Sequence, residues 1–122
     1  MVLRGVEELM DLLYAGRGVW DGPSGGTPGV DVLEHALQTA ALLRRSRPAD
    51  KELQVTGLVH PIGRLLCPAD AAARAEHAAD AVRPLLGERV AGLVRRQPWH
   101  GAPADDDLLS LRQADEDARV AG

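Results

Sequence analysis

The chain has 122 residues, of which 45% are hydrophobic and 26% are charged, and its net charge is −4. This length fits one domain, residues 1–122, built around a single core. The negative charge argues against a nucleic-acid partner, because proteins that bind nucleic acids present a basic surface. No apolar run approaches the length of a membrane span, so we expect no membrane partner.

Cysteine and aromatic residues are scarce. Cys67 is the single cysteine, so an internal disulfide is impossible and we expect a cytoplasmic protein. Its neighbours Leu65 and Leu66 favour a small buried hydrophobic residue over a nucleophile. Phenylalanine is absent. The core must therefore consist largely of Leu, Val and Ala, which suits closely packed helices.

Apolar residues recur at helical spacing along most of the chain. Asp31, Asp50 and Asp107 are the expected N-terminal caps. A long loop rich in glycine and proline (16–30) and a short polar loop (98–106) interrupt the pattern. The spacing predicts helices over residues 6–15, 31–47, 51–60, 71–83, 88–96 and 107–119, with the fourth closing near Pro84. We therefore predict an all-α bundle of five to six helices.

The segment GLVHPIGRLL, residues 57–66, places a proline directly after a histidine. Proline lacks a backbone N–H, and it disfavours α geometry in the residue before it. We therefore expect Pro61 to end the third helix, to push His60 out of α geometry and to turn its ring away from neighbouring donors.

The four histidines are spread over the predicted helices. His35, His60 and His77 lie on three successive helices, and His100 lies in the loop after Trp99. A single inward-facing histidine is more often a core residue with its hydrogen bonds satisfied than a ligand. Helical domains, however, build metal sites from side chains on facing helices. Histidines on three successive helices, followed by an acidic last helix with Asp115, fit that pattern.

Four segments together resemble a known family: LEHALQTAALLRR, ELQVTGLVHPIGRLL, EHAADAVRPLLGERV and LSLRQADEDARV. Across most of residues 12–122 the chain resembles the HD-domain metalloprotein superfamily. Within it, the chain is similar to predicted HD phosphohydrolases and to the mixed-valent di-iron oxygenases that cleave organophosphonates. That signature has a first His, a His-Asp pair, two further His and a late Asp. The resemblance implies an HD-like fold and assigns metal-ligand places to His35, His60, His77 and Asp115.

The chain departs from the family pattern at three places. Pro61 stands where the family has the aspartate that bridges two metals, and Arg64 stands where it has its next histidine. No histidine lies at residues 96–97, where the resemblance places another ligand, although His100 follows shortly after. Because proline has no side-chain donor, the resemblance implies a degenerate metal site rather than a standard di-iron centre.

Three functions remain open at this point. The leading hypothesis is a catalytically inactive pseudoenzyme that binds a small anionic molecule or a protein partner, with Arg64 and His100 as candidate ligand-binding residues. Arg64 is equally explained by an ion pair with an acid such as Asp115. The alternative is a metal-dependent enzyme, mononuclear or di-iron, that acts as an oxygenase or phosphohydrolase on a small phosphonate or phosphate. It would use iron or another divalent metal on His35, His60 and Asp115. A third is a structural homodimer subunit, which a solution mass would reveal.

Overall fold

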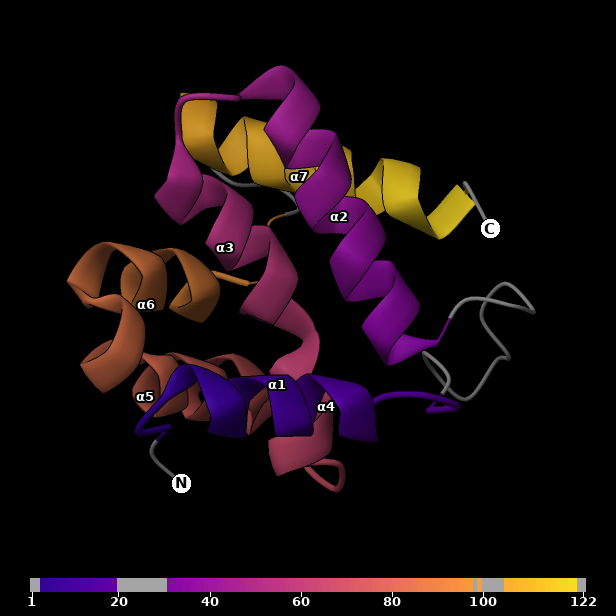
Figure 1. Cartoon of the computed structure of the whole chain (residues 1–122), viewed down its shortest axis with the longest axis vertical. Helices are drawn as coiled ribbons and strands as arrows, with labels where there is room; N and C mark the ends of the chain where they lie inside the picture. Colours follow the sequence, from indigo (N-terminus) through magenta and orange to yellow (C-terminus); the bar gives the residue numbers. More distant parts are fainter. Residues whose placement is uncertain (1–2, 20–30, 98, 100–104, 121–122) are drawn as a thin grey trace.

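The computed structural model describes residues 3–19, 31–97, 99 and 105–120 (Figure 1). These residues form helices and no strand, so the predicted all-α fold is confirmed. The helices are α1 (Val6–Ala15), α2 (Val32–Ser46), α3 (Lys51–Val59), α4 (Gly63–Leu66), α5 (Arg74–Leu86), α6 (Glu88–Arg95) and α7 (Asp106–Val120). Two 3-10 turns, η1 (His60–Ile62) and η2 (Ala71–Ala73), precede α4 and α5. Most of the two predicted loops, 16–30 and 98–106, lies outside the described residues.

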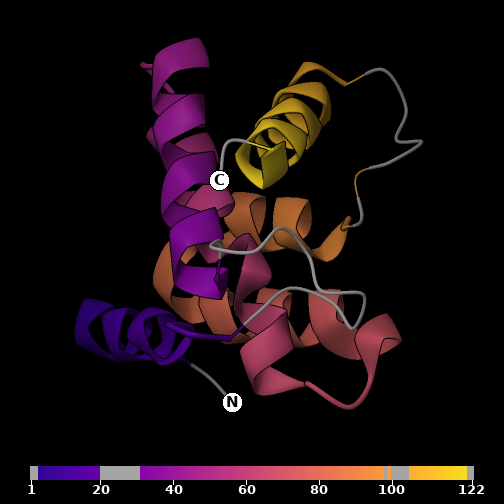
Figure 2. The same ribbon diagram turned by 90° about the vertical axis from the view of Figure 1, so that its right-hand side faces the viewer.

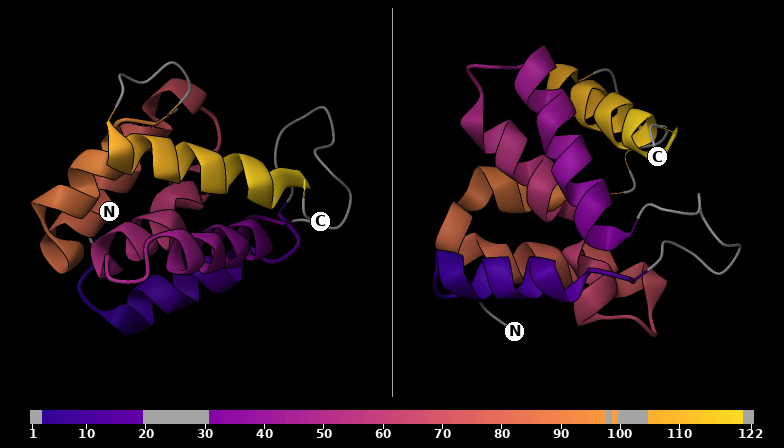
Figure 3. Two further views of the ribbon diagram at one scale, coloured as in Figure 1. Left: turned by 90° about the horizontal axis from the view of Figure 1, so that it is seen from above. Right: turned by 45° about the vertical axis from the view of Figure 1, so that its right-hand side comes forward.

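The helices form two groups that meet through α3 and α6. Helix α2 packs against α3 and α7 in one group, and Figures 1 and 2 show these three side by side. Helices α4 and α5 pack together in the other group, and buried residues of α1 share a hydrophobic cluster with those of α5 (Figure 1). Helix α6 contacts both α3 and α5, and the two views of Figure 3 show it at the edge of both groups.

Two hydrophobic clusters follow this division. The larger one includes Ala36, Val59 and Ile62 together with buried residues of α1, α5 and α6. The smaller one joins Leu43 and Leu53 to residues of α6 and α7. The ends of α2 and α3 that carry His35 and His60 lie beside the larger cluster, whereas α7 belongs to the smaller one. Polar side chains from these elements therefore meet at the boundary between the clusters.

Two predicted caps are confirmed. The Asp31 carboxylate accepts a hydrogen bond from the backbone N–H of Glu34 at 2.8 Å. The Asp50 carboxylate accepts one from Leu53 at 3.0 Å. Each cap satisfies a backbone donor that would otherwise lack a partner in the first helical turn.

The predicted cap of α7 is wrong, and the predicted end of α5 is early by a few residues. Asp105 rather than Asp107 caps α7, because its Oδ1 accepts the backbone N–H groups of Asp107 and Leu108 at 2.9 and 3.2 Å. Helix α5 runs through Pro84 and ends at Leu86. Gly87 follows with φ +93°, a left-handed value that glycine adopts without steric cost.

The expected effect of Pro61 on its neighbour is also wrong. Helix α3 does end at Val59, but His60 keeps α geometry with φ −56° and ψ −33°. The chain then continues through η1 directly into α4, and both Pro61 and Ile62 are buried. Burial of this turn in the core outweighs the local preference against α geometry before proline.

The helices were also compared with the length and hydrophobicity that a membrane span requires. None of the helices in the described part of the chain is long and apolar enough to cross a bilayer.

Candidate metal centre

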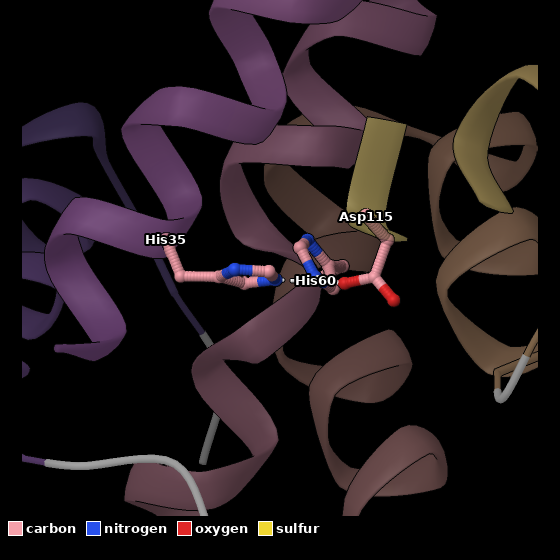
Figure 4. Close-up of side chains that lie close together, drawn as sticks. All are labelled: His35, His60 and Asp115. Carbon is pink, nitrogen blue, oxygen red and sulfur yellow. Dashed lines mark hydrogen bonds and ion pairs between the residues drawn. The ribbon is translucent and has the colours of Figure 1, made fainter. Parts of the chain in front are cut away.

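Three polar side chains from distant parts of the chain meet at the boundary between the two clusters. His35 comes from the first turn of α2, His60 opens η1, and Asp115 lies in the second half of α7. Figure 4 shows the two rings and the carboxylate converging. All three are buried, with exposures of 5%, 6% and 8%. Burying polar groups costs free energy unless they are paired. In this fold the three side chains are buried together, where they can pair with one another.

The carboxylate lies between the two rings. His35 Nε2 lies 2.7 Å and His60 Nε2 lies 3.1 Å from the same atom, Asp115 Oδ1. One ligand atom from each residue falls within 4.8 Å of the others. Atoms bound to a common ion at about 2.0–2.2 Å lie roughly 3–3.5 Å apart, close to the separations observed here. The group could therefore hold a metal ion after small side-chain shifts.

The hydrogen bonds of His60 determine which ring nitrogen carries its proton. His60 Nδ1 lies 2.6 Å from the carbonyl oxygen of Gly57. A carbonyl only accepts, so Nδ1 must carry the proton and donate it. In a neutral ring Nε2 then holds a lone pair, and that lone pair faces the Asp115 oxygen. Two acceptors in contact repel, so the pairing of His60 with Asp115 needs one more positive charge, either a proton or a metal ion.

Several side chains fix the position of His60. The indole of Trp99 lies against its ring at a centroid distance of 5.2 Å and donates to the carbonyl of Leu93. The amide of Gln97 donates to the His60 carbonyl at 3.0 Å and to that of Val94 at 3.1 Å. Gln97 is thus engaged with backbone oxygens, in a segment where the resemblance placed a further ligand.

Helices α2 and α3 approach closely because of a glycine. A Cβ atom at Gly57 would overlap the side chain of Leu43 and press on that of Thr39, both on α2. This close approach holds the start of α2 near the end of α3, where His35 and His60 lie. Their ring centroids are 5.2 Å apart in an edge-to-face arrangement.

Of the other predicted metal ligands, His77 does not belong to this group. His77 is exposed on α5, and Arg64 is half-buried on α4. His100 lies outside the described residues. Within the described residues, the group that could hold a metal ion consists of His35, His60 and Asp115.

Sequence reasoning missed the residues that support these three. Trp99, Gln97 and Gly57 were not predicted to contact His60. The sequence contains a signal for Gly57 only. Gly57 stands four residues before Pro61, which is the spacing of a helical hydrogen bond, so the proline leaves the Gly57 carbonyl without that donor. The other contacts depend on how α6 packs against α3.

A second polar cluster lies at the other ends of the same helices. Arg89 on α6 bonds both carboxylate oxygens of Asp50 at 2.8 Å and also reaches Asp107 at 3.0 Å. Arg47, just after α2, bonds Asp107 at 2.8 Å. The hydrogen bonds from Arg89 lower the pKa of Asp50 from 3.8 to about 2. Hydrogen bonds to Asp50 raise the pKa of Arg89 in turn.

No protein-family model, curated protein or solved structure matches this chain. The case for a function therefore depends on the geometry of the buried group.

Proposed function

We propose that this chain binds one divalent metal ion through His35, His60 and Asp115. The observation that carries the proposal is the position of His60: Nδ1 lies 2.6 Å from the Gly57 carbonyl oxygen, while Nε2 lies 3.1 Å from Oδ1 of the buried Asp115. A cation between these atoms turns a repulsive contact into an attractive one. Two imidazoles and one carboxylate suit iron(II), and also zinc.

We further propose that the centre is a degenerate, mononuclear form of an HD-like site that binds a small anion. Pro61 offers no carboxylate to bridge a second metal, and the amide of Gln97 is engaged with backbone carbonyls. One carboxylate only partly neutralises a divalent ion. The remaining positive charge in a buried site favours an anionic ligand, such as a phosphate or phosphonate, on the ion.

A mononuclear enzyme is the second candidate. Two histidines and one carboxylate are the donor set of non-haem iron oxygenases, which leave positions on the ion for substrate and oxygen. Such an ion could equally act as a Lewis acid toward a phosphate ester. The same three residues would hold the metal in this candidate, so turnover distinguishes it from the binding protein.

Metal titration of the chelator-treated protein tests the first proposal. We expect one Zn²⁺ or Fe²⁺ ion per chain, and at least a tenfold loss of affinity in His35→Ala. The matched control is His77→Ala, which alters an exposed histidine and should bind like the wild type. Equal loss in both variants, or no stoichiometric metal in the wild type, contradicts the proposal.

Anion binding and turnover separate the two candidates. Inorganic phosphate and methylphosphonate should bind the metal-loaded protein and not the metal-free protein. Under the first candidate both anions, and a simple phosphate ester, are recovered unchanged. Metal-dependent turnover that is lost in His35→Ala favours the mononuclear enzyme.

A further inference from the structure

Pro61 leaves one carbonyl of α3 without its usual donor. In an α-helix the N–H of each residue bonds the carbonyl four residues earlier, which for position 61 is that of Gly57. Proline has no N–H to offer. The preceding N–H, that of His60, bonds the carbonyl of Thr56. The Gly57 carbonyl accepts instead from the ring of His60, with Nδ1 at 2.6 Å.

We propose that Pro61 is a positioning residue: by freeing the Gly57 carbonyl, it fixes the ring and tautomer of His60 with Nε2 turned toward Asp115. Any other residue at position 61 brings an N–H that competes with the His60 ring for the same oxygen.

The role of this bond in metal binding rests on the function proposed above. Histidine ligands usually donate their second ring N–H to a carbonyl or carboxylate, and loss of that partner typically lowers metal affinity about 10- to 100-fold. Here the partner is a backbone oxygen that the proline makes available. The proline that replaces the bridging aspartate of the HD pattern thereby supports the remaining histidine ligand.

Histidine ¹⁵N NMR of the metal-free protein tests the tautomer directly. The ring signals are assigned by single His→Gln variants. We expect His60 in the wild type to carry its proton on Nδ1, as the bond to Gly57 requires. A wild-type His60 with its proton on Nε2 alone overturns the proposal, whether or not the protein binds metal.

The variant Pro61→Ala restores the N–H without adding a ligand. We expect the His60 signal to shift toward the Nε2–H form and Zn²⁺ affinity to fall about tenfold or more. Pro84→Ala is the matched control, since it makes the same change inside α5 at an exposed position. It should leave both the tautomer and the affinity unchanged.

The outcomes separate this inference from the proposed function. A His60 tautomer that responds to Pro61→Ala in a protein that binds no metal supports the positioning role and rejects the metal function. An unchanged tautomer in Pro61→Ala overturns the positioning role while the metal function stands. Pro61→Ser is the second variant, and failure of both variants to fold also overturns the proposal, because Pro61 would then act on the fold rather than through His60.

Discussion

The same three helices, α2, α3 and α7, are joined at both ends by polar side chains, and the two junctions differ in chemistry. At one end His35, His60 and Asp115 are buried. At the other, Arg47 and Arg89 pair with carboxylates whose side chains are 20% and 29% exposed. Arginine is always charged, so that junction is complete within the chain. The histidine junction consists of two rings and one carboxylate, a set of donors that could hold a metal ion.

The largest expected difference between the junctions concerns metal affinity. Asp115→Asn removes the only negative charge of the histidine group and keeps the side-chain size. Zn²⁺ affinity should therefore fall at least about 100-fold, which exceeds the loss typical when a residue that only hydrogen-bonds a metal ligand is removed. Asp107→Asn makes the same change at the arginine junction and should leave affinity unaltered. Calorimetric titration measures both. Similar losses in the two variants would show that the ion is not held by the histidine group.

A second prediction concerns the close approach that brings the histidines together. Gly57→Ala places a methyl group against Leu43, and overpacking of this kind lowers the free energy of unfolding by about 1–3 kcal/mol. Gly92→Ala on α6 is the control, because nothing lies within 4 Å of its Cβ position. It should leave stability unchanged or raise it by up to about 1 kcal/mol. Urea unfolding of both variants decides, and equal stabilities would mean that α2 and α3 are not in tight contact there.

The fold was easier to predict than the site because helical periodicity is a local property. The apolar spacing within each segment predicts the all-α class and most helix bounds. The group formed by His35, His60 and Asp115 joins residues 80 and 55 positions apart, so no local pattern contains it. The resemblance to HD domains proposed these three, and it also proposed His77, which is exposed. For His60 a local preference misled, since tertiary packing keeps this residue in α geometry before Pro61.

The arginine junction should depend on pH in a defined range. The pKa of Asp50 is about 2 in the folded protein against an ordinary 3.8, so its pairing stabilises the fold above pH 3.8 and is lost as pH falls toward 2. Arg89→Met should lower the free energy of unfolding by about 1 kcal/mol at neutral pH, after allowance for solvent screening, and by much less near pH 2.

The control for that measurement is Arg95→Met. Arg95 pairs with Glu76 at 3.3 Å, but both side chains are more than half exposed, at 58% and 56%. The change in unfolding free energy should stay below about 0.5 kcal/mol at either pH. If Arg89→Met and Arg95→Met behave alike, the network around Asp50 contributes no more than an ordinary surface pair.

The smallest effect we predict is the response of the two junctions to salt. At about 1 M salt the Debye length is roughly 3 Å, so exposed pairs are screened while buried ones are largely not. The destabilisation caused by Arg89→Met should shrink by roughly 0.5 kcal/mol, because the Arg89 side chain is 38% exposed. The stability difference between the wild type and Asp115→Asn, measured on metal-free protein, should stay the same, because Asp115 is only 8% exposed. Equal salt sensitivity at both junctions would mean that water reaches the histidine group as freely as it reaches Arg89.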